Sequence, residues 1–471
     1  MNTTQCLFFQ IGVGSYQCWR YNYTDGQPNQ SCFMKSNNPP FFHILLLSLV
    51  IYGCQPPEST STPIQPPNII LIMADDLGME TLGCYGGESY NTPNLDLLAA
   101  NGMRFDHAYS TPLCTPSRVQ LMTGKYNFRN YIAFGLLDAN ETTFAHLLKD
   151  AGYETCIVGK WQLYGNERQQ ELAGGRTGTV PEDAGFDDWC LWQVKERGYR
   201  FKSPTLTIRD QGTKEYPNQY GPDMFVDYLL SFMEARKEKP FFIYYPMVLT
   251  HDPFRPTPNS DEYDNDDLHT VNDSLWFKDN VQYMDQMIAR IVEKTKDLGV
   301  AENTIILFIG DNGTDRDVVS RWKGKHIQGQ KGTTLEAGIH VPMIANWPGT
   351  ITPGQVNDNL IDFTDFVPSL MDLAHIELPE DFTTDGLSFY SQLTAEAGPA
   401  RDWVFGHYDP KWGQFEAKRY ALDHRWKLYA DGSFYDFNED PLEKNPLDMQ
   451  ALDQEQQQAL SKLQGALARF E

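Results

Sequence analysis

Basic residues are scarce in this 471-residue chain, which has 38 Lys and Arg against 63 Asp and Glu and a formal net charge of −25. This surplus of negative charge argues against non-specific binding to nucleic acid or to anionic lipid. Any anionic ligand must therefore meet a locally basic pocket. Because 41% of the residues are hydrophobic, the chain can still bury a core large enough for one big domain and a small one.

Cysteine is also scarce in the part of the chain after residue 55, whose sequence is typical of a globular protein. Half of the eight cysteines precede residue 55, and the others are Cys84, Cys114, Cys156 and Cys190. The spacings of these four match no zinc-binding or Cys-x-x-Cys pattern, and four are too few for a disulfide framework in a chain of this size.

The apolar run Phe41–Ile51 is too short to cross a bilayer as a mature helix, which takes ~20 apolar residues. It follows Met34-Lys35 and precedes Tyr52-Gly53-Cys54, an order that resembles a bacterial lipoprotein signal. We therefore expect residues 1–33 to be an upstream extension outside the mature protein and residues 34–54 to be a signal peptide. An ordinary cleaved signal peptide or a buried apolar segment is the alternative.

On this interpretation Cys54 is lipidated, and residues 55–67, rich in Pro, Ser and Thr, form a linker. The protein is then exported to the periplasm, the outer membrane or the cell surface. Its membrane contact is expected only through the lipid anchor.

From Asn68 short apolar runs alternate with helical patterns, which predicts an α/β domain over residues 68–384. Its central sheet should be mostly parallel or mixed and flanked by helices. The strand-length runs are Ile69–Met73, Thr155–Val158, Phe241–Met247, Ile305–Ile309 and Val341–Ala345. Helices are expected from Thr92-Pro93 to Gly102, from a Thr142 cap to Gly152, over Pro222–Glu238 and over Asp273–Leu298.

Residues 385–471 have a different character and predict a small C-terminal α+β subdomain. Short aromatic runs separated by turns such as Asp431-Gly432 indicate an antiparallel sheet. These runs are Trp403–Gly406, Arg419–Leu422, Trp426–Tyr429 and Ser433–Tyr435. A polar helix from about Asp448 to Phe470 is expected to end the chain.

Polar side chains follow four of the predicted strands: Asp75-Asp76, Lys160, His251 and Asp311-Asn312. Ligands bind at the carboxyl ends of strands in open α/β sheets, so these residues can converge on one crevice. Each alone is equally typical of a turn or a helix cap. Together, the oxygen atoms of the acids and the amide predict a site for Ca²⁺ or, less favoured, Mg²⁺.

The most specific motif is Leu113-Cys114-Thr115-Pro116-Ser117-Arg118, followed by Thr123-Gly124. It resembles the signature of the formylglycine-dependent type I sulfatases, an alkaline-phosphatase-like family that includes bacterial polysaccharide sulfatases. A buried free cysteine beside a proline-started helix would not require the other positions. The resemblance covers Ile69–Gly349 and resumes weakly over Tyr420–Pro441.

The resemblance implies that a formylglycine-generating enzyme oxidises Cys114 to formylglycine (3-oxoalanine). One hydroxyl of the hydrated aldehyde attacks sulfur, and collapse to the aldehyde later expels sulfate, which a serine ester would release slowly. With Cys114 modified, at most one disulfide can form among the remaining three cysteines of the domain.

The resemblance also assigns roles by position. Asp75, Asp76, Asp311 and Asn312 would hold calcium with residue 114, and Arg118 would fix the formylglycine. Lys160 and Lys331 would bind sulfate oxygens. His251 would protonate the leaving oxygen, with Lys331 as its helper or rival.

One position departs from the family pattern. The family usually has histidine two residues after the lysine, where it deprotonates the hydrated aldehyde, whereas this chain has Gln162. An amide can bind substrate but cannot act as a base at neutral pH. Either another group takes the proton, or turnover is slowed, or activity is lost; we favour the first.

The expected substrate is a sulfated carbohydrate, namely an algal-type polysaccharide such as ulvan or its oligosaccharides. Trp192, Tyr220 and Arg255 are the predicted sugar contacts, although aromatic residues are more often core. The alternatives are a phosphonate or phosphodiester hydrolase of the same superfamily and a catalytically silent carbohydrate-binding relative.

Overall fold

The computed structural model describes residues 66–470 and, nearer the N-terminus, only the backbone of four short strands. The strands are paired as β1 (Phe8–Gln10) with β2 (Tyr16–Cys18) and β3 (Tyr23–Thr24) with β4 (Gln27–Pro28). The predicted signal peptide at residues 34–54, with Cys54, and all but the end of the linker lie outside the described residues. The chain divides into two compact units, residues 1–62 and 63–471, and the second holds the sheets described below.

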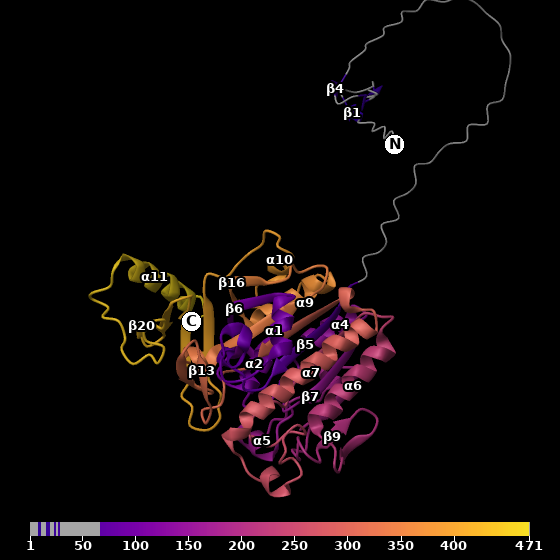
Figure 1. The fold of residues 1–471 in the computed structure, drawn as a ribbon. Coiled ribbons are helices and arrows are strands. Elements are labelled where there is room, and N and C mark those ends of the chain that lie inside the picture. The colour runs from indigo at the N-terminus through magenta and orange to yellow at the C-terminus, as the bar shows by residue number, and fades with distance from the viewer. Residues whose placement is uncertain (1–7, 11–15, 19–22, 25–26, 29–65, 471) are drawn as a thin grey trace, which may run out of the picture. The chain divides into compact units, whose positions relative to one another are not determined.

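A ten-stranded mixed sheet forms the centre of this second unit (Figure 1), in the order β10-β9-β8-β7-β11-β5-β12-β15-β6-β16. The strands from β8 to β12 are parallel, β15 is antiparallel to both neighbours, and β16 is parallel to β6. The central strands are β5 (Asn68–Ala74), β7 (Glu154–Lys160), β8 (Asp188–Trp192), β11 (Phe241–Pro246) and β12 (Thr304–Gly310). The others are β6 (Met103–Tyr109), β9 (Thr205–Ile208), β10 (Gly212–Glu215), β15 (His340–Asn346) and β16 (Gln355–Asp362).

Two layers of helices bury the faces of this sheet, which explains why its central strand β5 is a continuous apolar run. Alternate β5 side chains enter separate cores, with Ile69 and Leu71 on one face and Ile70 and Ile72 on the other. The first face is covered by α2 (Cys114–Thr123), α4 (Phe144–Asp150) and α9 (Phe366–Ala374). The second is covered by α1 (Pro93–Ala100), α6 (Gly221–Arg236) and α7 (Phe277–Asp297).

A four-stranded antiparallel sheet follows in the C-terminal part, drawn in yellow to one side in Figure 1. Its strands are β17 (Val404–Tyr408), β18 (Lys418–Leu422), β19 (Trp426–Tyr429) and β20 (Phe434–Asp436). Helix α11 (Gln454–Ala468) packs on one face of this sheet. The other face shares a core with Tyr109 of β6 and Leu360 of β16, so the two sheets are joined at the β16 edge.

The structure confirms the predicted fold class and all five strand-length runs. The C-terminal sheet has the predicted strands within a residue or two, but its helix begins at Gln454 rather than Asp448. The cap of α4 is Thr143 rather than Thr142, because the Thr143 side chain accepts the Ala145 N–H. The boundary between residues 68–384 and 385–471 stays a prediction. Within the described part of the chain, no helix is both long and apolar enough to span a bilayer.

Candidate active site

Cys114 is the first residue of α2, and it lies at the base of a cavity. Every residue of α2 is buried, so the short helix is fixed on all sides. Its N-terminus presents backbone N–H groups that favour a negative charge beside residue 114. The thiol itself lies 3.8 Å from Oε1 of Gln162.

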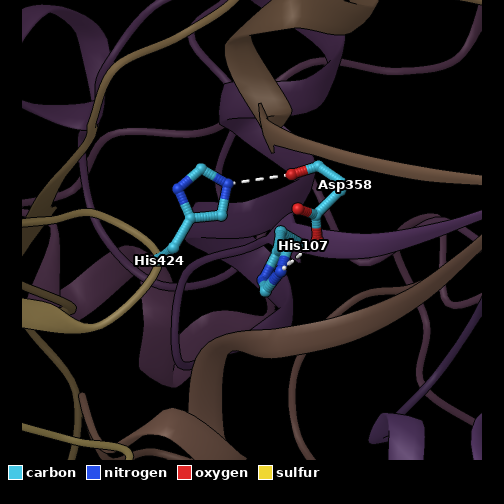
Figure 2. Close-up of side chains that lie close together, drawn as sticks. All are labelled: His107, Asp358 and His424. Carbon is cyan, nitrogen blue, oxygen red and sulfur yellow. Dashed lines mark hydrogen bonds and ion pairs between the residues drawn. The ribbon is translucent and has the colours of Figure 1, made fainter.

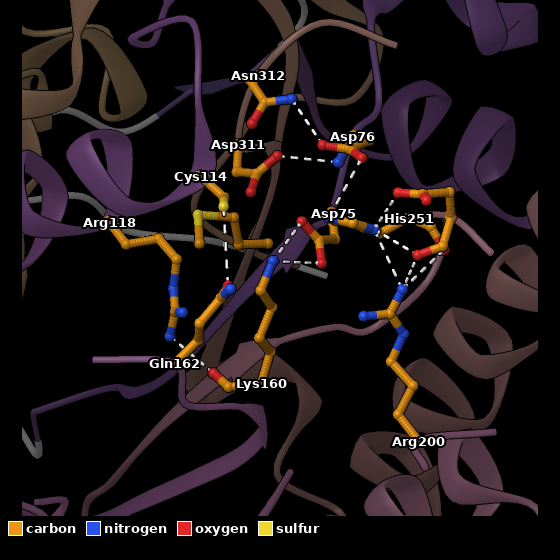
Figure 3. A network of polar contacts seen from close by, with 12 residues as sticks. Asp75, Asp76, Cys114, Arg118, Lys160, Gln162, Arg200, His251, Asp311 and Asn312 are labelled. Carbon is orange, nitrogen blue, oxygen red and sulfur yellow. Dashed lines mark hydrogen bonds and ion pairs between the residues drawn. The ribbon is translucent and has the colours of Figure 1, made fainter. Parts of the chain in front are cut away.

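The acids predicted to bind a metal converge beside Cys114 (Figure 3). Asp75 and Asp76 follow β5, and Asp311 and Asn312 follow β12, the parallel neighbour of β5. The Asp76 N–H donates to Asp311 Oδ1 over 2.9 Å, and Asn312 Nδ2 donates to Asp76 Oδ1 over 2.8 Å. One ligand atom each from Asp75, Cys114 and Asp311 lie within 4.8 Å of one another.

This group of oxygen atoms fits a hard divalent cation. Asn312 Oδ1 is buried and has no hydrogen-bond partner among the described residues, whereas nearly all buried side-chain oxygens in proteins have one. Burial raises the pKa of Asp311 well above its ordinary range, and the charges of Asp75 and Asp76 raise it further. A cation bound between the carboxylates removes both problems, and calcium accepts this all-oxygen ligand set.

Lys160 pairs with Asp75 at the end of β7, and both side chains are 2% exposed. Its Nζ donates to both carboxylate oxygens over 2.9 and 2.8 Å. Gly159 precedes Lys160 with a φ of 107°, and a Cβ there would lie 2.1 Å from the carbonyl oxygen of Pro246. Only glycine lets β7 approach β11 this closely.

Lys331 and His251 occupy the other side of Asp76. Lys331 donates to Asp76 Oδ2, and its Nζ lies 3.2 Å from His251 Nε2. The other imidazole nitrogen, Nδ1, lies 2.8 Å from the carboxylate of Asp252. Arg200 stands behind this pair, with Nη2 3.1 Å from His251 Nδ1.

The surroundings of the site favour an ionised Asp75 and a protonated thiol at Cys114. Burial would raise the pKa of Asp75, but the charges of Lys160, His251 and Lys331 hold it below its ordinary range. Burial raises the pKa of the Cys114 thiol, and the charge of Lys160 only partly opposes this. An unmodified Cys114 is therefore a weak nucleophile, because the thiolate is the reactive form.

Arg118 binds the backbone rather than another side chain of the predicted site. Its guanidinium donates to the carbonyl oxygens of Lys160, over 2.7 Å, and of Trp161. Its Nε is buried without a hydrogen-bond partner among the described residues. Arg118 therefore links α2 to the end of β7, which positions Lys160 against residue 114.

The cavity above Cys114 has a volume of about 640 Å³ and a basic, aromatic lining. The lining cations are Arg168, Arg197, Arg200, Arg316, Lys331 and His251. The aromatic residues are Phe134, Trp192, Trp412 and Phe415. This is the locally basic pocket that the negative charge of the whole chain requires of an anionic substrate.

Two aromatic residues of this cavity come from the loop between β17 and β18. Trp412 stacks on Phe134 with ring centroids 4.8 Å apart, and Arg168 lies 5.5 Å from the Trp412 centroid. Phe415 packs over Gly332, where a Cβ would lie 2.4 Å from the ring. Gly332 has a φ of 82°, so the residue after Lys331 must be glycine for both reasons.

The structure therefore brings together all the residues predicted for catalysis and metal binding. Gln162 lies at the cavity wall with a φ of 47°. Of the three predicted sugar contacts, Trp192 lines the cavity. The structure does not place the other two there: Tyr220 packs in the core, and neither Tyr220 nor Arg255 lines the cavity.

The arginines and the loop aromatic residues of the cavity were not predicted from the sequence, because no local motif marks them. Arg168 lines the cavity from a short helix, α5 (Glu167–Leu172). Trp412 lies 298 residues after Cys114 in the sequence. The four described cysteines are all free. No disulfide therefore forms within residues 66–470.

Comparisons with known proteins identify the family of the chain. The family described as Sulfatase matches residues 67–376, and that described as N-sulphoglucosamine sulphohydrolase, C-terminal, matches residues 324–469. Human N-acetylgalactosamine-6-sulfatase is 32% identical over 363 residues, which cover 70% of this chain and 66% of the human protein, slightly less than two thirds.

Solved structures share the fold. A sulfatase from Pseudoalteromonas sp. is 23% identical with a TM-score of 0.67, over 86% of this chain and 90% of that one. A protein solved with its substrate D-glucosamine-2-N,6-O-disulfate is 22% identical with a TM-score of 0.70, over 86% and 98%. At these identities the likeness concerns the fold alone.

Proposed function

Because the chain belongs to the sulfatase family, whose members are sulfuric ester hydrolases, we propose that it hydrolyses sulfate esters of a sulfated carbohydrate. The proposal includes a formylglycine made from Cys114 by a formylglycine-generating enzyme, and a calcium ion held by Asp75, Asp76, Asp311 and Asn312. One observation carries it. Cys114 lines the basic cavity, and one ligand atom each from Cys114, Asp75 and Asp311 lie within 4.8 Å of one another.

When present, the formylglycine supplies a hydrated aldehyde as nucleophile, and the calcium ion lowers its pKa and polarises the sulfate. Lys160 adds a buried positive charge next to residue 114 while it fixes Asp75. Lys331 reaches the cavity wall and can bind a sulfate oxygen there. Both charges offset the negative charge that develops as the sulfur centre is attacked.

His251 holds the proton for the leaving alcohol. Asp252 accepts from Nδ1, so the opposite nitrogen, Nε2, points toward Lys331. A proton on Nε2 can pass to the leaving oxygen, and this transfer is general acid catalysis.

The cavity lining supports a substrate with more than one anionic group. Lys160, Lys331 and the cation already serve a single sulfate, yet Arg168, Arg197 and Arg316 also line the cavity. Guanidinium groups bind carboxylates and sulfates through paired hydrogen bonds. Stacked Phe134 and Trp412 offer an aromatic surface for a sugar ring. We therefore propose a sulfated polysaccharide of the algal, ulvan-like type, or its oligosaccharides.

We also propose that the protein is exported and anchored through lipid on Cys54. Incorporation of labelled palmitate by cells that express the full chain tests this directly. The label should be present in the wild type and absent from Cys54→Ala. Equal labelling of both proteins would contradict the anchor.

The decisive experiment for the activity is coexpression with a formylglycine-generating enzyme. Mass spectrometry of the peptide that contains residue 114 should show the aldehyde. The purified protein should release sulfate from a panel of sulfated oligosaccharides, ulvan fragments included, and Cys114→Ala should lower kcat/KM by at least about 10³-fold.

Two results would contradict the proposal. An unmodified Cys114, beside a known sulfatase that the same cells do modify, would favour the silent carbohydrate-binding relative. Faster hydrolysis of phosphonate or phosphate diesters than of any sulfate ester would favour the phosphonate or phosphodiester hydrolase.

A further inference from the structure

We propose that His107, Asp358 and His424 form a second metal site, which binds a transition-metal ion such as Zn²⁺ where the two sheets meet (Figure 2). One ligand atom from each of these three side chains lies within 4.8 Å of the other two. They come from three separate elements: β6, β16 and the turn between β18 and β19. None of the three lines the cavity above Cys114.

A bulge in β16 directs Asp358 at this site. The parallel ladder between β16 and β6 is regular up to Asn357 and resumes at Leu360, so Asp358 and Asn359 lie in the irregular stretch. Asn357 Oδ1 stabilises it by accepting the Asn359 N–H over 2.8 Å. Bulges redirect side chains at strand edges, and here Asp358 Oδ1 lies 3.0 Å from His107 Nε2.

His424 completes the group from the C-terminal sheet. Its Nε2 lies 2.8 Å from the carbonyl oxygen of Asp358, and its ring is edge-on to that of His107 with centroids 4.7 Å apart. His424 and Asp358 are exposed. Their side chains can therefore rotate by the small amount that brings nitrogen ligands to the ~2.0–2.1 Å typical of zinc.

His107 has a ring nitrogen that no protein group uses. Its Nδ1 is buried without a hydrogen-bond partner among the described residues. A neutral imidazole has a free lone pair, the form that binds metal.

The ligand types separate this site from the catalytic one. Two imidazoles and one carboxylate suit Zn²⁺, Ni²⁺ or Cu²⁺, whereas the oxygen atoms around Asp311 suit calcium. A metal at His107 would connect the edge of the large sheet to the C-terminal sheet. Its function would be structural, because it would hold the junction together without touching the substrate cavity.

The test uses the full chain dialysed against zinc in a constant excess of calcium, which keeps zinc from the oxygen atoms around Asp311. Elemental analysis should find one zinc per chain in the wild type. Affinity should fall at least tenfold in His424→Ala and in Asp358→Ala, which remove exposed side chains and leave the core intact. The matched control is His326→Ala, which removes an exposed histidine of the hairpin strand β14 (Lys325–Gln328) and should bind zinc normally.

Thermal unfolding provides a second readout. Zinc at a large excess over its Kd should raise the Tm of the wild type by roughly 2 °C or more, and should leave that of His424→Ala unchanged. Equal zinc affinity in the wild type and in both alanine variants would overturn the proposal. Zinc binding that is lost only in Asp311→Asn would overturn it too, by assigning the zinc to the catalytic cluster.

Discussion

Buried carboxylates crowd together in two regions of this protein, and the two regions satisfy them differently. At the junction of the sheets, Asp362 and Asp365 are both buried. Arg401 donates to both oxygens of Asp365, and Asp362 Oδ1 accepts from Gln120 and from Thr364. Protein donors therefore meet the needs of this acid pair.

In the catalytic cluster Lys160, Lys331 and Asn312 donate to Asp75 and Asp76, but one buried oxygen atom is left without a donor. Asp311 accepts a backbone N–H from Asp76, but Asn312 Oδ1 has no partner among the described residues, and burial and neighbouring acids raise the pKa of Asp311. The comparison teaches that crowded acids alone do not identify a metal site. A buried oxygen atom that the protein leaves without a donor beside them, here Asn312 Oδ1, is the stronger sign.

The largest expected effect is on kcat/KM, and it should appear in only one of the two regions. Asp311→Asn removes a charged group of the proposed calcium site with little change in shape. It should lower kcat/KM by roughly 10²–10⁴-fold, which corresponds to the several kcal/mol that a metal contributes to the transition state. Asp362→Asn makes the same chemical change at the junction and should leave kcat/KM within about twofold. Comparable losses in both variants, measured by sulfate release, would break the comparison.

The next effect concerns pH and the junction alone. Burial raises the pKa of Asp362 from 3.8 to about 6, although Arg401 opposes this. The folded state therefore favours protonated Asp362, a stabilisation that is complete below pH 4 and lost as the pH rises through 6. Two pKa units correspond to up to about 3 kcal/mol.

Urea unfolding at fixed calcium from pH 4 to pH 7 measures this effect. The free energy of unfolding of Asp362→Asn should rise relative to that of the wild type by up to the same amount as the pH increases. Parallel pH profiles for the two proteins would show that Asp362 keeps an ordinary pKa.

Calcium should stabilise the catalytic region and leave the junction unaffected. After chelation, calcium at 100-fold its Kd should restore about 2.7 kcal/mol to the free energy of unfolding. Asp362→Asn should retain this gain, and Asp311→Asn should lose most of it. Magnesium at the same concentration serves as the control for ion selectivity.

The smallest expected effect is on kcat and concerns the catalytic cluster alone. Gln162 has a left-handed φ of 47°, which histidine tolerates better than most residues. Gln162→His places a base near residue 114 and should raise kcat about tenfold where loss of sulfate limits turnover. The gain should fade below pH 6.5, the ordinary pKa of histidine. An unchanged kcat would show that another group already takes the proton.

The sequence predicts the centre of the fold better than its edges. Strands β5, β11 and β12 are buried on both faces, so each is an unbroken apolar run. Strand β6 was missed because Arg104, Asp106 and His107 interrupt its apolar residues. Strand β16 was missed for a similar reason, since Asp358 and Asn359 form its bulge.

The same distinction applies to the site. Asp75, Lys160 and Asp311 were predictable because each directly follows a recognisable strand, and Cys114 because its motif is local. The roles of Arg118 and Arg200 depend on which carbonyl groups lie opposite them after folding. Trp412 reaches the cavity from a separate sheet, and no spacing in the sequence encodes that approach.

Because of the loop between β17 and β18, two separate parts of the chain line one cavity, and each part can vary independently of the other. Its residues Trp412 and Phe415 belong to the C-terminal sheet, whereas the hydrolytic groups belong to the large one. Under the proposed function, exchange of this loop between relatives would change which glycan is accepted and leave the ester-cleaving groups as they are. Substrate preference can therefore change in evolution independently of the hydrolytic residues.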